Sequence, residues 1–107
     1  MRNFTVTLDV DALDDLAAIR AHITQASGSI IADRFVRRVF DYVDGFRVAP
    51  FRGTLREDIR PGLRTVAWRR TLTIAFVVDE ASDAVIVLAA LYRGRDVEAV
   101  LKRRTTT

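Results

Sequence analysis

The sequence predicts a single α+β domain over residues 1–107, in the order β-α-α-β-β-β with a short C-terminal helix. Apolar residues alternate over residues 4–8 and 72–78, as in strands, and recur over residues 13–46 with the period of helices. Residues 84–92 form a continuous apolar run. We therefore expect an N-terminal helical hairpin packed on a small, mainly antiparallel twisted sheet. A chain of 107 residues is long enough for one such core and too short for two ordinary domains.

The first strand and the first helix are expected between residues 3 and 26. Phe4, Val6 and Leu8 alternate with polar residues, which is typical of a strand with one buried face. Asp9 or Asp11 can accept hydrogen bonds from the free amides at a helix start. The apolar face predicted for this helix consists of Leu13, Leu16, Ala17 and Ile23.

A second amphipathic helix is expected after the break at residues 27–29, whose Ser-Gly-Ser sequence offers a new cap. So short a break predicts an antiparallel hairpin of two helices. Gly45 weakens the end of the second helix and Pro50 prevents its continuation, which leaves residues 47–62 as a basic connector. The residues that mark the apolar face of this helix are Ile31, Phe35, Val39, Val43 and Phe46.

The C-terminal half is expected to supply three strands and a helix. Residues 63–68 follow the turn pair Pro61-Gly62, residues 72–78 alternate, and the polar loop 80–83 leads into residues 84–92. Because the last strand is apolar on both faces, we expect it in the interior of the sheet. Gly94 permits a bend, and Asp96 caps a final short helix.

Composition excludes several classes of site. The chain has no cysteine and one histidine, His22, so it offers neither a cysteine–histidine metal site nor a Ser-His-Asp triad, and we expect no metal and no cofactor. His22 itself is expected as a solvated helix residue. The N-terminus lacks the apolar run of a signal peptide, and the longest apolar stretch is too short for a bilayer. A cytoplasmic protein with no membrane partner is therefore expected.

Positive charge is concentrated in two zones. Residues 46–73 carry a net charge of +5 and residues 93–107 of +3, whereas residues 1–29 and 74–92 are acidic. Guanidinium groups stay protonated and fit carboxylates and phosphates, so these zones predict an acidic or polyanionic partner. The residues predicted to contact it are Arg64, Trp68, Arg69, Arg70, Arg93, Arg95 and Arg103.

Four segments in this order resemble the RelE/ParE superfamily of toxins from bacterial toxin–antitoxin operons. They are the acidic helix start at residues 11–16, the Ala-Asp-Arg-Phe at residues 32–35, the Ile-Arg-Pro-Gly-Leu-Arg at residues 59–64, and the ending at residues 92–98. The resemblance covers almost the whole chain. It implies a RelE/ParE-like fold and a toxin that a cognate, acidic, ParD-like antitoxin wraps and neutralises in a toxin–antitoxin hetero-oligomer.

Two activities are implied within this superfamily. ParE-like members resemble inhibitors of DNA gyrase, which block replication, and RelE-like members resemble ribosome-dependent mRNA endonucleases, which inhibit translation. Thr73 stands where a RelE-type arginine is often found, and Glu98 replaces a C-terminal tyrosine. Because RNA cleavage needs an acid, a base and a cation, both departures weaken the case for a nuclease. The Pro-Gly-Leu-Arg of the connector and the Arg-Asp of the ending resemble ParE-like members instead.

We therefore expect a gyrase inhibitor that is not an enzyme and has no catalytic residues. The alternative is an endoribonuclease acting on the ribosome, in which Arg64, Tyr92 and Arg93 would carry the catalysis. A third reading is a nucleic-acid-binding module whose arginines hold phosphates, although few aromatic residues lie beside them in the sequence.

Overall fold

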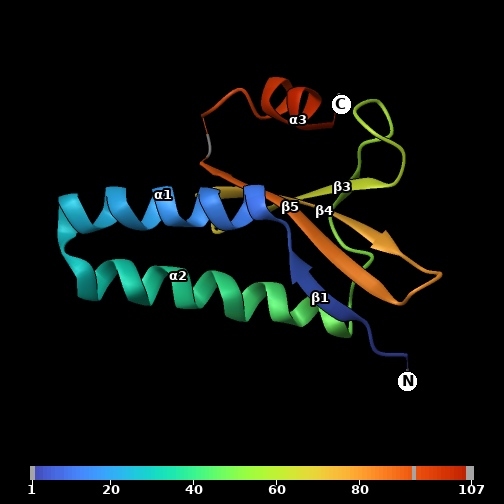
Figure 1. Ribbon diagram of the computed structural model, residues 1–107, viewed down its shortest axis with the longest axis horizontal. Coiled ribbons are helices and arrows are strands. Elements are labelled where there is room, and N and C mark those ends of the chain that lie inside the picture. The colour runs from blue at the N-terminus through green and yellow to red at the C-terminus, as the bar shows by residue number, and fades with distance from the viewer. Residues whose placement is uncertain (1, 93, 106–107) are drawn as a thin grey trace.

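The computed structural model describes residues 2–92 and 94–105, without the side chain of residue 105. Three helices and a five-stranded mixed sheet follow the predicted order (Figure 1). The elements are β1 (Thr5–Leu8), α1 (Val10–Ser27), α2 (Ser29–Asp44), the 3-10 turn η1 (Gly45–Arg47), β2 (Thr54–Leu55), β3 (Leu63–Trp68), β4 (Leu72–Asp79), β5 (Ala84–Tyr92) and α3 (Val97–Thr105).

The sheet has the strand order β1-β5-β4-β3-β2 and is antiparallel except where β1 runs parallel to β5. The predicted interior position of β5 is confirmed. One element was missed. The connector predicted over residues 47–62 contains β2, whose two residues pair with Thr65 and Arg64 of β3 and close the far edge of the sheet. A two-residue strand carries no periodic signal, so sequence patterning does not detect it.

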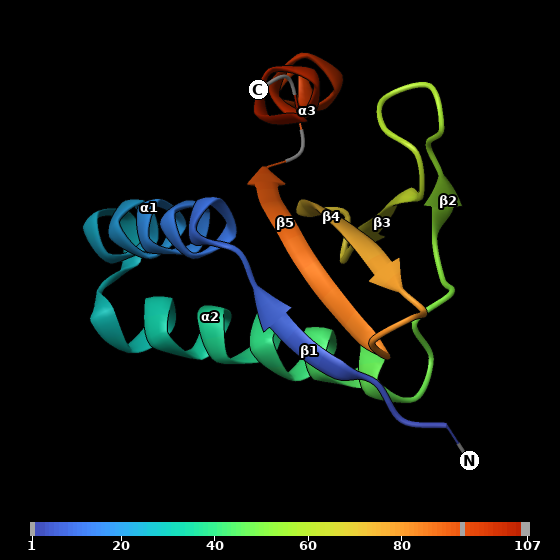
Figure 2. The ribbon, with the colours of Figure 1, turned by 45° about the vertical axis from the view of Figure 1, so that its right-hand side comes forward.

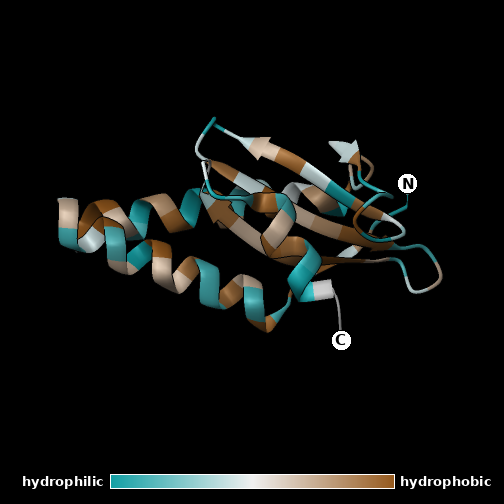
Figure 3. Ribbon diagram, turned by 90° about the horizontal axis from the view of Figure 1, so that it is seen from above, coloured by the Kyte–Doolittle hydropathy of each residue, from teal (hydrophilic) through white to brown (hydrophobic). Residues whose placement is uncertain are grey.

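Helices cover both faces of the sheet. The α1–α2 hairpin packs on one face, and α3 lies against the other near the end of β5 (Figure 2). The hairpin-side core includes Phe46 and Phe76, whose rings stack at 4.4 Å. The smaller core under α3 joins Leu63 and Leu91 to Leu101. Hydropathy follows these layers, since the inner strands are mostly hydrophobic and the helices alternate (Figure 3).

A bulge in β5 serves both cores. Phe76 pairs with Val87 and Ala75 pairs with Ala89, so Leu88 is inserted between two paired positions. One extra residue reverses the alternation of side chains between the two faces. Before the bulge Val87 faces the helical hairpin, and after it Ala89 faces α3. The apolar side chains of β5 therefore contribute to the cores on both faces of the sheet.

The helical hairpin differs in detail from its prediction. Gly28 separates the helices with φ of +92°, as the Ser-Gly-Ser break predicts. Asp9 is the N-cap residue of α1, but its side chain makes no capping hydrogen bond. The predicted apolar face of α1 was partly wrong, because Leu13 and Ala17 are exposed. Ile31 of α2 is exposed too, while the later residues of its face are buried or half-buried. The residues of α1 that are buried are Ala12, Asp15, Leu16 and Ile19.

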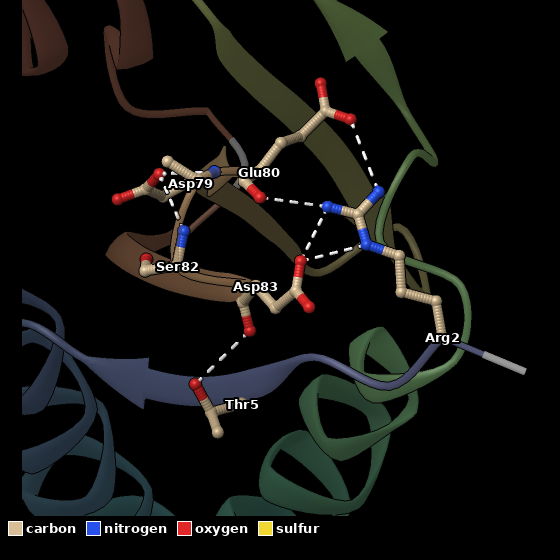
Figure 4. A network of polar contacts seen from close by, with 7 residues as sticks. Arg2, Thr5, Asp79, Glu80, Ser82 and Asp83 are labelled. Carbon is tan, nitrogen blue, oxygen red and sulfur yellow. Dashed lines mark hydrogen bonds and ion pairs between the residues drawn. The ribbon is translucent and has the colours of Figure 1, made fainter.

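The β4–β5 turn is tied to the N-terminal segment by a polar network (Figure 4). Arg2 donates from Nε and Nη2 to Oδ1 of Asp83, at 2.9 and 2.6 Å, and from Nη2 to the Glu80 carbonyl at 2.9 Å. The Thr5 amide donates to the Asp83 carbonyl at 2.9 Å, one residue before the β1–β5 ladder begins. Asp79 accepts from the Ser82 amide, and bonds to Ser82 hold the pKa of this carboxyl below its ordinary value. These contacts fix the register of the parallel pair.

The β3–β4 turn has a strained backbone. Arg69 and Arg70 have φ of +49° and +56°, and the Thr71 amide donates to the Trp68 carbonyl at 2.9 Å. Two consecutive positive φ values are the pattern of a type I′ hairpin turn, which favours Asn-Gly. Each left-handed non-glycine residue costs about 1–2 kcal/mol. Both central positions are nevertheless arginine.

In the described part of the chain, no helix is both long enough and apolar enough to cross a bilayer.

Two glycines with similar φ allow a matched test of the β2 edge. A Cβ at Gly53 (φ +78°) would overlap the Thr65 carbonyl oxygen, whereas a Cβ at Gly62 (φ +77°) meets nothing within 4 Å. Gly62→Ala should cost about 1–2 kcal/mol from backbone strain alone. Gly53→Ala should cost at least about 1 kcal/mol more, because β2 must move away from β3. Urea unfolding followed by the fluorescence of Trp68 measures both, and equal losses would contradict a tight β2–β3 approach.

Candidate functional site

A hollow opens beside the last residues of β5, where β1 no longer pairs with this strand. β1 pairs with β5 only over residues 84–87, so residues 88–92 face α1 across an open edge. The hollow has a volume of about 260 Å³. Side chains of α1, of β5 and of the segment that leads to α3 line it: Asp15, Ala18, Ile19, His22, Ala90, Tyr92 and Arg95.

Asp15 is a buried carboxylate in this hollow, with its side chain 8% exposed. Its Oδ2 accepts from the Ala90 amide at 2.9 Å, which satisfies a backbone donor that β1 does not reach. Arg104 of α3 donates Nη1 and Nη2 to the two carboxylate oxygens, both at 2.7 Å. This fork, chiefly its hydrogen bonds to Asp15, raises the pKa of Arg104 above its ordinary value. One carboxylate thus joins α1, β5 and α3.

His22 and Tyr92 meet at the mouth of the hollow. Their rings pack edge to face with centroids 5.9 Å apart. His22 is exposed, as predicted, but it is not isolated from other functional groups, because Arg95 lines the same hollow. Burial raises the pKa of the Tyr92 phenol above its ordinary value, so it stays protonated at neutral pH. The trio can supply a phenol that donates a hydrogen bond, an imidazole and a cation to a ligand.

Two residues of the alternative catalytic set, Arg64 and Tyr92, are not brought together. Arg64 of β3 pairs with Phe76 of β4, and Tyr92 of β5 pairs with Leu72, which lies four residues before Phe76 in β4. Arg64 and Tyr92 therefore lie on strands that are separated by β4. Strand geometry puts their Cα atoms roughly 16 Å apart. Arg64 instead lies over the Phe51 ring at 5.5 Å. Arg93 falls outside the described residues.

Trp68 is a core residue rather than an exposed anchor. It is 5% exposed, and its ring packs on Phe35 at 5.3 Å and on Tyr42 at 6.5 Å, both from α2. Arg69 and Arg70 follow it at the exposed tip of the β3–β4 hairpin. The tip therefore lies against α2, and Arg69 shares a hollow of about 540 Å³ with Arg38 of that helix.

Arg103 is exposed on α3, on the opposite side of the sheet from α2. Glu98, near the start of the same helix, belongs to a network that ties α3 to the loop after β2. Glu98 pairs with Lys102 at 2.8 Å and with Arg56 at 3.5 Å, and Arg56 also forks onto Asp58. The hydrogen bond from Lys102 holds the pKa of Glu98 below its ordinary value, and that from Arg56 does the same for Asp58. The predicted contact residues thus occupy several separate surfaces.

Sequence reasoning missed Asp15, Arg104 and Arg38. Asp15 was placed only within the acidic helix start at residues 11–16. Asp15 lies three residues after Ala12 and four before Ile19, so it belongs to the apolar face of α1. A carboxylate at such a position is expected to be buried and to need a partner. Arg38 lies in a segment of zero net charge, residues 30–45, where averaging concealed it.

Comparisons with known proteins give one consistent result. The family described as "ParE toxin of type II toxin-antitoxin system, parDE" matches residues 6–97. No curated protein matches the sequence. A chromosomal ParDE toxin–antitoxin system from P. aeruginosa superposes with a TM-score of 0.72 at 22% identity, over 86% of this chain and 98% of that one.

Two RelBE complexes share the fold more distantly. The RelBE2 complex from Mycobacterium tuberculosis gives a TM-score of 0.62 at 19% identity, over 85% of this chain and 99% of that one. The intact RelBE complex from E. coli gives 0.52 at 15% identity, over 86% of this chain and 99% of that one. The family match ends at Val97, the first residue of α3.

The Asp15–Arg104 pair should be strongly coupled in stability. Asp15→Asn and Arg104→Gln should each lower the free energy of unfolding by about 2–4 kcal/mol, because each leaves a largely desolvated group without its charged partner. The double variant should cost clearly less than the sum of the two. Urea unfolding of the four proteins gives the coupling energy, and Arg104→Lys keeps the charge but loses the fork. Additive losses would show that the pair does not hold α3.

Proposed function

The chain belongs to the ParE toxin family of type II toxin–antitoxin systems, and we propose that it acts by inhibiting DNA gyrase, without an enzymatic activity of its own. A cognate antitoxin neutralises it by binding its surface. The family match over residues 6–97 carries this proposal. The protein is accordingly a growth-inhibiting toxin, and gyrase is the target that we assign to it.

The surroundings of Glu98 support inhibition rather than RNA cleavage. Glu98 is held between Lys102 and Arg56, and its lowered pKa keeps it ionised at neutral pH. A fixed carboxylate repels a scissile phosphate and cannot act there as an acid. Thr73 lies within the β3-β4-β5 ladder, paired with Ala67 and Leu91, and adds no cation. Both positions therefore serve the fold instead of phosphate chemistry.

One observation favours the alternative of a ribosome-dependent mRNA endonuclease. The hollow beside β5 gathers His22, Tyr92 and Arg95, which are groups used in general acid–base catalysis and charge stabilisation. Tyr92 keeps its proton and so could only act as an acid, which leaves His22 as the base. The two functions differ in which process the toxin stops first.

We propose that the antitoxin is acidic and contacts Arg64 and Arg95. Neither arginine makes an ion pair with a carboxylate anywhere in residues 2–92 and 94–105, although Arg64 stacks on Phe51. Unneutralised guanidinium groups on an exposed or half-buried surface favour a partner rich in Asp and Glu.

Parallel assays of supercoiling and translation separate gyrase inhibition from RNA cleavage. Purified toxin should abolish gyrase supercoiling of relaxed plasmid or accumulate cleaved DNA, and should leave cell-free translation intact. Added antitoxin should restore gyrase. Loss of translation with normal supercoiling would overturn the proposal. In that event His22→Ala and Tyr92→Phe, if they restored translation without lowering thermal stability, would assign the activity to the hollow.

Charge reversal tests the antitoxin contact. Arg64→Glu with Arg95→Glu should lower the association rate with the purified antitoxin at least about tenfold and reduce its dependence on salt, since exposed interface charges act mainly on association. Surface plasmon resonance at two salt concentrations measures both effects. Circular dichroism checks that the variant is folded. An unchanged association rate in a folded variant would exclude these arginines from the interface.

A further inference from the structure

We propose that the tip of the β3–β4 hairpin and the adjoining flank of α2 form a binding site for the phosphate backbone of duplex DNA. We call this site the hairpin–helix patch. It consists of Arg34, Arg38, Arg69 and Arg70. The inference goes beyond gyrase inhibition, because it requires the toxin to hold DNA itself, with or without the enzyme. Four guanidinium groups suit the regular negative charge of a duplex.

The strained turn is the first observation behind the patch. Arg69 and Arg70 both adopt positive φ, at positions where Asn-Gly is the preferred pair. Strain of this kind is concentrated at functional sites, where the surrounding structure holds it in place. Here the flanking Trp68 is buried against Phe35 and Tyr42, which fixes the tip on α2. The turn therefore presents two adjacent cations on a rigid support.

Convergence of charge from two elements is the second observation. Arg38 of α2 and Arg69 of the tip line one hollow of about 540 Å³, with Tyr42, Ala67 and Trp68. Arg34 lies one helical turn before Arg38, on the same side of α2. Asp41 is the acidic residue that lines this hollow. A phosphate at its mouth would meet guanidinium groups from both elements.

Three of the four arginines are not neutralised by a carboxylate of the described residues. Over the described ranges 2–92 and 94–105, Arg34, Arg38 and Arg69 make no ion pair. The guanidinium of Arg69 lies 5.1 Å from the centroid of the Trp68 ring, a contact that leaves its hydrogen-bond donors open. Some arginines elsewhere are paired, as Arg20 is with Asp33 and Arg104 with Asp15.

The surface chemistry favours DNA over an acidic protein. Protein interfaces are built around buried apolar and aromatic anchors. None of the exposed large apolar side chains lines the hollow of the patch, and Trp68 is already buried. Because no exposed aromatic side chain lines this hollow, base stacking is not expected as the main contact there, and binding should depend on phosphates and not on sequence.

The test uses the full-length toxin and a fluorescein-labelled 20-base-pair duplex of arbitrary sequence, followed by anisotropy over a range of salt concentrations. Arg69→Asn with Arg70→Gly should weaken binding at least about tenfold at low salt and reduce the slope of log K against log[salt] by about two. Because Asn-Gly suits the turn, the melting temperature should not fall. Loss of binding thus cannot be attributed to misfolding.

Two further variants make the result specific to the patch. Arg60→Gln with Arg103→Gln removes two exposed charges elsewhere and should change binding less than about threefold. Asp41→Asn removes the repelling carboxylate and should tighten binding several-fold. An equal loss of DNA affinity in the control and the hairpin variant, or no effect of Asp41→Asn, would show that the DNA is attracted only by overall positive charge. Either result would contradict the proposed site.

Two further comparisons separate DNA from an acidic protein as the partner, and the patch from the proposed gyrase target. A labelled polyglutamate chain of matched charge should bind at least about tenfold more weakly than the duplex; equal or tighter binding that needs Arg69 and Arg70 would assign the patch to an acidic protein instead. These measurements contain no gyrase. A toxin that binds DNA through the patch but leaves supercoiling intact would refute the proposed target alone, and gyrase inhibition without DNA binding would refute the patch alone.

Discussion

The position of α3 depends on one buried carboxylate. β1 is four residues long and leaves the Ala90 amide of β5 without a strand partner, so a polar group must satisfy that donor inside the hollow. Asp15 does so, and its charge in turn requires a cation, which Arg104 supplies in a two-bond fork. The short first strand thus creates the need for Asp15, and Asp15 in turn creates the need for Arg104. Without this pair α3 would be held mainly by a small apolar cluster and the exposed pairs of Glu98.

The bulge at Leu88 decides which core each of the last residues of β5 packs into. A regular β5 would send Ala90 toward α3 and Leu91 toward the helical hairpin. With one residue inserted, Ala90 joins the hairpin-side core next to α1, and Leu91 packs against α3. Ala90 leaves room for Asp15 to reach its amide. Sheet register, the Asp15 contact and the docking of α3 are therefore set by the same irregularity.

Element types and their order could be predicted from the sequence because they follow from periodicity in long segments. The period of α2 identified Phe35, Val39, Val43 and Phe46, and the apolar run of residues 84–92 identified an interior strand. β2 could not be found, because two residues show no period and their pairing is decided by β3. The stripe of α1 was misread because Asp15 lies within it, and a polar residue in an apolar face breaks the pattern.

The candidate sites were harder to predict, since charge in a sequence says nothing about neutralisation in space. Arg103 and Arg104 are adjacent, yet one is exposed and the other is locked in the buried pair. Arg38 lies in a neutral segment, yet it makes no ion pair within the described residues although Asp41 lines the same hollow, and the hairpin tip adds Arg69 beside it.

Arginines that make no ion pair within residues 2–92 and 94–105 therefore lie on separate surfaces, for example Arg38 and Arg69 on the α2 side of the sheet, Arg95 at the open end of β5, and Arg103 on α3. A compact partner that covers one of these surfaces leaves the others accessible. An extended acidic segment, which advances about 3.3 Å per residue, can reach several of them with few residues. We infer that separation of its cationic surfaces is what lets one small domain present different contacts to an antitoxin and to its target.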